Sequence, residues 1–238
     1  MTGDVLEVED GDTFVLGTVG REITIRLLGV NAPERDECFH DKAAAGLASY
    51  LDNRAVGVED HGEDQFGRTL GYVWAGDTLV NLALVANGLA IATTPGDTDT
   101  WGPRLLAAEE AAYRARIGLW DQTACSGHAT TDIDLSIDTA GHNPPGADDQ
   151  VLDLEQVTII NNGDEAVDIS GWVLRDESSA HRFRFPGGSV IGPGAAIQVT
   201  SDDPGWEPGG TPVWNNTGDM ALLLTPDGGV TARQRYRP

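Results

Sequence analysis

The stretch "VLEVEDGDTFVLGTVGREITIRLL" (residues 5–28) decides the fold of the first half of the chain. Apolar and polar residues alternate in three short runs, at 5–8, 14–19 and 22–28. Such alternation predicts half-buried β-strands. The Asp10–Thr13 tetrapeptide between the first two runs has the composition of a hairpin turn. We therefore expect a three-stranded meander whose first turn carries two carboxylates, Asp10 and Asp12, either as solvated turn residues or as ligands.

Helix and strand patterns follow the meander in an order typical of a small barrel. Strands are predicted at 55–60 and 69–77, and helices at 40–53, 79–88 and 102–118. The predicted inward face of the first helix consists of Ala45, Leu47, Ala48 and Leu51. Gly88 is placed as a C-terminal cap, and Pro103 and Gly118 mark the two ends of the last helix. This order predicts a small Greek-key barrel with helical additions.

The chain is unusually acidic. It has 38 acidic and 15 basic residues, and its formal net charge is −23. The excess is spread over both halves, so it is not an acidic tail. Because salt at 1 M screens self-repulsion within about 3 Å, the charge favours a haloarchaeal-like adaptation to concentrated salt over mere high solubility. It also disfavours binding of polyanions, unless a metal ion and local arginines reverse the potential at one site.

Separated motifs then occur in a specific order along the first half. Asp10–Thr13 is followed by "RLLGVNAPE" (26–34), "DQFGRTLGYVW" (64–74), "LVNLALVANGLA" (79–90) and "GLW" (118–120). In these motifs the chain resembles the staphylococcal nuclease family, over roughly residues 1–121. The resemblance implies an OB-fold, a five-stranded barrel with three helices, that hydrolyses phosphodiester bonds of DNA and RNA with calcium and leaves 3′-phosphate ends.

The resemblance also implies a calcium site. Calcium prefers oxygen ligands, and the family pattern supplies them from the Asp12 carboxylate, the Asn31 side chain and the Ala32 backbone carbonyl. Asp10 would lie behind Asp12 and orient it. A well-known member of the family has a second aspartate where this chain has Asn31. The site therefore loses one negative charge, and we expect weaker calcium binding.

The groups that would act on the phosphate are assigned by the same resemblance. Glu34 matches the carboxylate that positions or deprotonates the attacking water, and Arg26 and Arg68 match two arginines that grip the phosphate. Phe66 takes the place of a nucleotide-contacting tyrosine as an apolar wall. Each feature alone has a structural alternative, because such a turn is usually only a turn and an Arg–Glu pair is usually a surface salt bridge. Their joint occurrence favours catalysis.

Cys38 and Cys125 are the only two cysteines. Two free thiols and one bridge are both possible by number, whereas a zinc site made by these two alone is disfavoured, because zinc takes about four ligands and no CxxC motif is present. In secreted relatives of the nuclease family, cysteines at similar places look like a disulfide pair. The resemblance therefore implies a Cys38–Cys125 bridge, which would add about 3 to 5 kcal/mol by restricting the unfolded chain.

Short strands and Gly, Pro, Asn and Asp turns make up the second half. Strands are predicted at 133–137, 156–161, 171–176, 181–185, 196–200, 220–224 and 230–236, with the spacing of a sandwich. Residues 154–201 and 213–228 resemble the lamin-tail domain, an immunoglobulin-like β-sandwich, and the similarity covers roughly 132–238. Asn161–Gly163 is predicted to be a hairpin turn, Trp172 a core residue and Pro193–Gly194 a chain reversal.

We therefore expect a mainly β protein of two domains, a nuclease-like OB-fold domain at 1–128 and a lamin-tail-like sandwich at 129–238. The first would be a calcium-dependent endonuclease acting on DNA and/or RNA. The alternative is an inactive barrel that binds nucleic acid or serves as a scaffold. The second domain shows no acid–base couple, so a binding or tethering role is expected. Arg182 and Arg184 lie on one face of a predicted strand and form either a nucleic-acid contact or a salt-bridge face.

The chain is also expected to act outside the cell. No apolar run approaches the roughly 20 residues that cross a bilayer, and no basic segment followed by an apolar one precedes the first strand. We expect an extracellular or cell-surface protein without its leader, in which Met1 begins either a trimmed mature form or a sequence shortened for expression.

Overall fold

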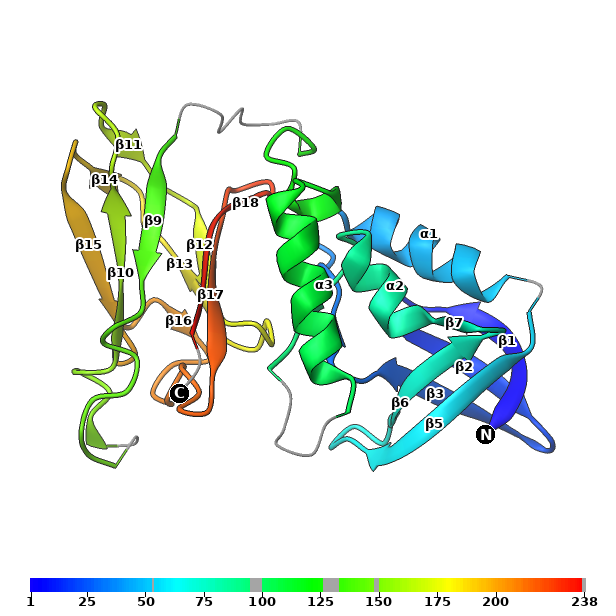
Figure 1. Cartoon of the computed structure of the whole chain (residues 1–238). Coiled ribbons are helices and arrows are strands. Elements are labelled where there is room, and N and C mark those ends of the chain that lie inside the picture. Colours follow the sequence, from blue (N-terminus) through cyan, green and yellow to red (C-terminus); the bar gives the residue numbers. More distant parts are fainter. Residues whose placement is uncertain (53, 95–99, 126–132, 148–149, 237–238) are drawn as a thin grey trace. The chain divides into compact units, whose positions relative to one another are not determined.

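A computed structural model shows the whole chain in Figure 1 and describes residues 1–52, 54–94, 100–125, 133–147 and 150–236. The chain divides into two compact units, Met1–Asp121 and Gln122–Pro238. The predicted domain boundary between residues 128 and 129 lies outside the described residues. Within the described ranges, no helix is both long and apolar enough to cross a membrane.

A closed β-barrel forms the body of the first unit (Figure 1). Its strands are β1 (Thr2–Val8), β2 (Thr13–Thr18), β3 (Arg21–Leu27), β5 (Val56–Glu63) and β6 (Thr69–Ala75). The short strand β7 (Thr78–Leu79) pairs antiparallel with the end of β6, and β4 (Val30–Asn31) pairs with β8 (Ile91–Ala92). Parallel pairing of β3 with β6, with Ile25 opposite Thr69, closes the ring. The predicted OB-fold barrel is confirmed.

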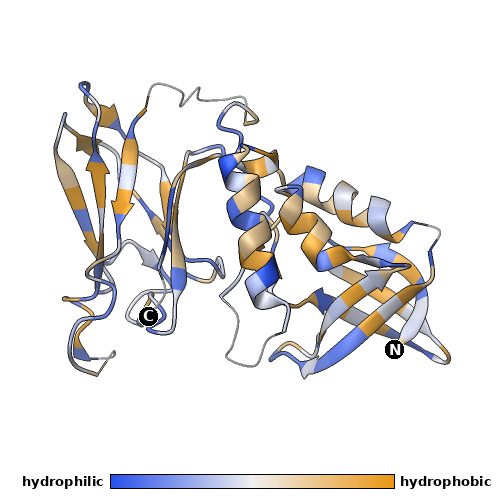
Figure 2. Cartoon of the chain, in the orientation of Figure 1, coloured by the Kyte–Doolittle hydropathy of each residue, from blue (hydrophilic) through white to orange (hydrophobic). Residues whose placement is uncertain are grey.

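Alternation along the strands explains the core of this barrel. Phe14, Leu16 and Ile25 are fully buried, whereas the residues between them are less buried. Figure 2 shows apolar residues recurring along the barrel strands and on the helices. Three helices cover the barrel: α1 (His40–Leu51) packs on β1, α2 (Val80–Ala86) on β6, and α3 (Gly102–Arg114) on α2.

The inward face of α1 differs from the prediction. Its buried residues are Ala43, Leu47 and Leu51, and Ala45 is exposed. The buried positions are spaced by four residues, so they share one helix face. Among three consecutive alanines, hydropathy alone could not show which one faces the barrel.

The last helix of the first unit ends earlier than predicted. α3 stops at Arg114, and the chain passes through Arg116, which has a φ of 53°, before the short 3-10 helix η1 (Gly118–Trp120). A Cβ on Gly118 would lie 2.3 Å from the carbonyl oxygen of Gly88. Only a glycine fits at this close contact, just beyond the end of the helix. Gly88 itself follows α2 with a φ of 59°, which confirms the predicted helix cap.

Two packed sheets form the second unit. One contains β9 (Leu135–Asp138), β10 (Gln156–Asn161) and β15 (Ala196–Thr200). The other contains β12 (Val173–Arg175), β13 (Arg182–Arg184), β16 (Trp206–Glu207), β17 (Asp219–Leu224) and β18 (Val230–Tyr236). Between them lies an apolar core that includes Trp172, Trp206 and Trp214, so the predicted β-sandwich and the core position of Trp172 are confirmed.

One turn prediction in the second unit is wrong. Asn161–Gly163 does not join two paired strands, because β10 pairs with β9 and β15 while β11 (Val167–Asp168) pairs with β14 (Val190–Ile191). Asn161 is fully buried, and its Nδ2 donates to the carbonyl oxygens of Glu165 and Ile191 at 2.7 and 3.0 Å. This side chain thus links the end of β10 to β14 and to the loop that precedes β11. Pro193–Gly194 reverses the chain between β14 and β15, as predicted.

Candidate active site

The Asp10–Thr13 segment is a tight turn between β1 and β2. The amides of Glu9 and Asp10 donate to the carbonyl oxygen of Thr13, and the Asp12 amide donates to Oδ1 of Asp10 at 2.9 Å. Gly11 is required here, because a Cβ would lie 2.5 Å from Cβ of Ala43 and 2.6 Å from Cβ of Ala32. The turn is therefore packed against α1 and against the loop that carries Ala32.

Asp12 and Asn31 converge on a single nitrogen. Nη2 of Arg26 donates to Oδ2 of Asp12 at 3.1 Å and to Oδ1 of Asn31 at 2.8 Å. Both acceptor residues are about 95% buried. Residues that lie 19 positions apart in the sequence are thus joined by one guanidinium, and the two oxygens face the same positive centre.

Burial dominates the electrostatics of Asp12. It raises the pKa of this carboxyl to about 6, although the Arg26 charge lowers it. The neighbouring Asp10 carboxylate raises the pKa further, whereas the Ala32 amide, which donates to Oδ2 at 2.6 Å, lowers it. The Asp12 carboxylate is therefore a buried negative charge that a cation would stabilise.

Arg26 also fixes the loop that carries Asn31. Its Nη1 donates to the carbonyl oxygens of Leu27 and Val30 at 3.0 and 2.8 Å. Between them lies Gly29, with a φ of 74°, where a Cβ would lie 2.8 Å from a methyl group of Leu105. In this structure Arg26 therefore organises the two oxygen donors from one side and their loop from the other.

Glu34 lies two residues beyond Ala32 and is exposed. The backbone amide of Glu34 donates to Oε2 of the buried Glu37 at 3.2 Å, so this part of the backbone is held in place. The Glu37 amide in turn donates to the Glu34 carbonyl at 2.9 Å. The chain thus presents an exposed carboxylate on a hydrogen-bonded backbone, three residues after Asn31.

Arg68 lies beside the β3–β6 seam of the barrel. It precedes Thr69, which pairs with Ile25, so Arg68 and Arg26 are close in register. Nε and Nη2 of Arg68 both contact Oδ2 of Asp64 at 2.7 Å, and its guanidinium lies 5.4 Å from the ring centre of Phe66. Within the described part of the chain, Nη1 has no hydrogen-bond partner. Phe66 is 74% exposed.

Asp64 is the residue that holds this arginine, and the sequence patterns did not identify it. Its Oδ1 accepts the amides of Phe66 and Arg68, and Oδ2 accepts the guanidinium. Burial alone would raise the pKa of Asp64, but the hydrogen bonds from Arg68 and Phe66 outweigh it and the pKa lies below its usual value. An Asp that precedes a turn and accepts amides two and four residues later is a local signal that could have been recognised.

The donor set suits a hard cation. No group of three or more His, Cys, Asp or Glu side chains in the described residues could hold a metal ion. The expected ligands are instead one carboxylate, one amide oxygen and one backbone carbonyl, all oxygens, of which two already converge on one cationic nitrogen. Oxygen ligands of this kind are those that calcium accepts.

The two cysteines are bonded to each other. Cys38 and Cys125 are both oxidised, and no other cysteine exists. Cys38 lies four residues after Glu34, so the bridge anchors the same loop. The disulfide that the resemblance implied is confirmed.

Comparison with known proteins agrees with this geometry. The family described as "Staphylococcal nuclease homologue" matches residues 24–122. The chain is 32% identical over 126 residues to a thermonuclease of Staphylococcus intermedius, covering 50% of this chain and 75% of that protein. The first unit belongs to the staphylococcal nuclease family. The "Lamin Tail Domain" family matches residues 128–237, so a lamin tail domain follows.

Other relatives carry similar names. Protein ParB of Escherichia coli is 33% identical over 129 residues, covering 50% of this chain and 72% of that protein. Micrococcal nuclease of Shigella flexneri is 32% identical over 127 residues, again covering 50% of this chain and 72% of the relative. All these similarities cover half of the chain, which is the extent of the nuclease-family domain.

Proposed function

We propose that this protein is a calcium-dependent endonuclease that hydrolyses phosphodiester bonds of DNA and/or RNA and leaves 3′-phosphate ends. The observation that carries the proposal is the convergence of Asp12 Oδ2 and Asn31 Oδ1 on Arg26 Nη2, with the exposed Glu34 three residues after Asn31 in the chain. A nuclease must neutralise an anionic substrate and place a water for attack, and this arrangement offers groups for both tasks. The names of the relatives support the reaction class.

The oxygen donors define where calcium would bind. Asp12, Asn31 and the Ala32 carbonyl would hold the ion, and Asp10 would orient Asp12 through its amide. A bound ion would supply positive charge against the phosphate oxygens. The raised pKa of Asp12 supports this role, because a buried carboxylate gains most from a cation.

The remaining side chains would act on the substrate directly. Glu34 would orient the attacking water or accept its proton at its exposed carboxylate. Arg68 would donate from Nη1 to a phosphate oxygen, while Asp64 holds its Nε and Nη2 in place. Phe66 offers an exposed ring for contact with a base. Arg26 would add positive charge and keep the two oxygen donors together.

Salt adaptation and secretion are part of the same proposal. The net charge of −23 would repel nucleic acid at low ionic strength, and salt at 1 M screens this repulsion within about 3 Å. The disulfide supports an oxidising compartment. We expect activity to persist or rise between ~0.1 M and ~2 M salt, opposite to the usual loss for nucleic-acid binders.

Incubation of the pure protein with DNA and with RNA, in calcium and then with a chelator, tests the proposal. The expected result is cleavage to 3′-phosphate ends with calcium, arrest by the chelator and recovery when calcium is restored. A chain cut after residue 128 keeps both cysteines and all proposed catalytic groups, so it should cleave as well. Binding of DNA without cleavage at any calcium concentration would favour the inactive barrel instead.

A further inference from the structure

The backbone around Glu34 is held by two side chains that no proposed catalytic role uses. Oε2 of Glu37 accepts the Glu34 amide at 3.2 Å. Nδ1 of His40 lies 3.0 Å from the carbonyl oxygen of Pro33. Because a carbonyl only accepts, His40 donates in this contact, and its Nδ1 carries the proton.

These two bonds act on the same peptide group. The carbonyl of Pro33 and the amide of Glu34 belong to one planar unit, so Glu37 and His40 grip its two polar ends. A third bond, from the Glu37 amide to the Glu34 carbonyl at 2.9 Å, fixes the peptide that follows. The main chain of Glu34 is therefore hydrogen-bonded on both sides, although its own side chain is exposed.

Glu37 and His40 are themselves held in place. Glu37 is 6% exposed, and His40 is the first residue of α1. Cys38 lies between them and is bonded to Cys125. The segment from Glu37 to His40 is thus tied to the helix at one end and through a covalent bond in its middle.

We propose that Glu37 and His40 are positioning residues that hold the Glu34 carboxylate in its reactive place. This rests on the proposed function of Glu34. With the main chain fixed, the position of the Glu34 carboxylate depends only on the side-chain torsions of Glu34. Misplacement of a reacting group by 1 Å costs on the order of 100-fold in rate, so loss of this grip should slow the chemical step rather than weaken substrate binding.

Paired substitutions separate positioning from a general structural role. Glu37→Ala removes the acceptor and should lower kcat at least tenfold with KM within about twofold. Glu37→Gln keeps an oxygen that accepts the same amide, so kcat should stay within about threefold. His40→Asn places a donor near the position of Nδ1 and should be active, whereas His40→Gln extends it beyond that position and should be slow. His61→Ala, on β5, is the matched control.

A double-mutant cycle shows whether Glu37 acts through Glu34. In the Glu34→Gln background, Glu37→Ala should change the residual rate by less than about twofold. An equal loss in both backgrounds, or a Glu37→Gln variant as slow as Glu37→Ala, would overturn the proposal. If Glu37→Ala does not fold, the comparison of His40→Asn with His40→Gln tests the proposal. Equal rates for these two variants would show that the hydrogen bond from His40 does not position Glu34.

The same cycle separates this proposal from the proposed function. If Glu34→Gln is slow and Glu37→Ala is fully active, only the positioning role is wrong. If Glu34→Gln itself retains the full rate, the role of Glu34 is wrong, and the positioning role falls with it.

Discussion

A buried carboxylate in each unit, Asp12 in the nuclease-family domain and Asp219 in the lamin tail domain, shows how a site differs from a structural anchor. Asp219 is fully buried and accepts the amides of Glu177, Asn215 and Met220. Asp12 accepts one amide from a distant residue, that of Ala32, and shares a guanidinium with Asn31. Burial raises the pKa of both carboxyls. What distinguishes them is therefore the partner set and not burial.

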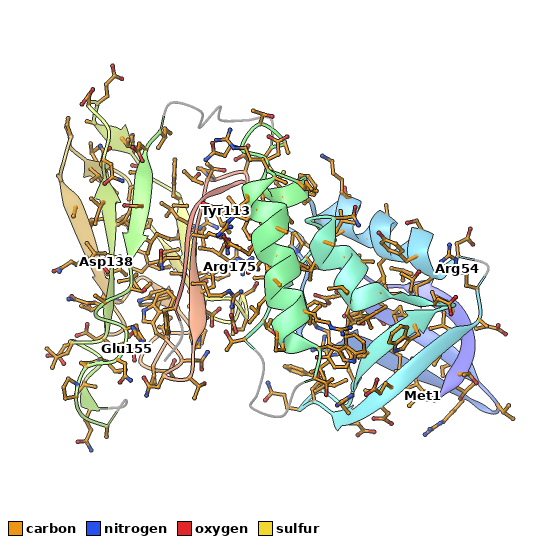
Figure 3. The ribbon with its side chains drawn as sticks, viewed as in Figure 1. Met1, Arg54, Tyr113, Asp138, Glu155 and Arg175 are labelled. Atoms are coloured by element: carbon orange, nitrogen blue, oxygen red, sulfur yellow. The ribbon has the colours of Figure 1, made fainter. Side chains whose placement is uncertain are left out.

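Glu155 repeats the pattern of Asp219. It is 1% exposed, and its Oε1 accepts the hydroxyl of Ser201 and the amides of Val213 and Trp214. Figure 3 labels this residue in the lamin tail domain, together with Arg175 on β12. Carboxylates whose oxygens are occupied by backbone amides hold loops to a sheet. Convergent side-chain oxygens next to exposed charged groups indicate chemistry.

Loss of the disulfide should have the largest effect on stability. Cys38→Ser combined with Cys125→Ser removes a bridge that closes most of the nuclease-family domain, so the free energy of unfolding should fall by about 3 to 5 kcal/mol. Thermal unfolding of the variant and of the reduced wild type measures it. Equal stability of the oxidised and reduced protein would contradict the account.

The next largest effect is expected at the structural anchor in the other domain. Glu155→Ala leaves two buried amides without this acceptor, so the free energy of unfolding should fall by about 3 kcal/mol. The folded fraction of the variant should cleave at the wild-type rate. Glu155→Gln keeps an acceptor oxygen and should cost less. Calorimetry together with a cleavage assay tests both expectations, and a folded but inactive Glu155→Ala variant would break the division of roles between the domains.

Asn31→Asp restores a charge at the proposed calcium site. The calcium concentration for half-maximal cleavage should fall roughly tenfold if the added charge is worth ~1.4 kcal/mol. A calcium titration of both variants measures it. Unchanged calcium dependence would show that residue 31 is not a ligand.

A histidine should make the stability of the lamin tail domain depend on pH. The hydrogen bond to Asp176 raises the pKa of His181, against the opposing effect of burial. A raised folded-state pKa gives stability that is complete below the unfolded value of about 6.5 and is lost as pH rises through the folded value. The wild type should have a higher free energy of unfolding than His181→Asn. This difference should be larger near pH 6 than near pH 9 by about 1 kcal/mol, allowing for the partial exposure of His181. Denaturant unfolding of both proteins in 1 M salt at the two pH values measures this difference. A difference that does not change with pH would argue against a stabilising His181–Asp176 pair.

The sequence predicted the barrel and its site loop because the determinants are local. Alternation marks β1 to β3, and the turn chemistry of Asp10–Thr13 marks the hairpin. The end of α3 could not be predicted in this way. The close approach of Gly118 to Gly88, just beyond that end, joins residues 30 positions apart.

The site itself was predicted by residue type but not by partner. No local pattern shows that Arg26 would join Asp12 to Asn31, since these contacts depend on the register of β2 against β3, with Thr13 opposite Arg26, and on the loop that follows β3. The grip on Glu34 has only a weak signal, a second glutamate three residues later and just before a helix. Asn161 shows the opposite case, because its turn-like composition concealed a buried side chain that binds carbonyl groups.

The rate of DNA cleavage by Glu34→Gln under single-turnover conditions, at saturating calcium, tests the central claim most directly. The account predicts a rate at least ~100-fold below that of the wild type, with an unchanged unfolding midpoint, because the exposed Glu34 carboxylate acts on the transition state and not on the fold. A folded Glu34→Gln variant that cleaves at the wild-type rate would contradict it.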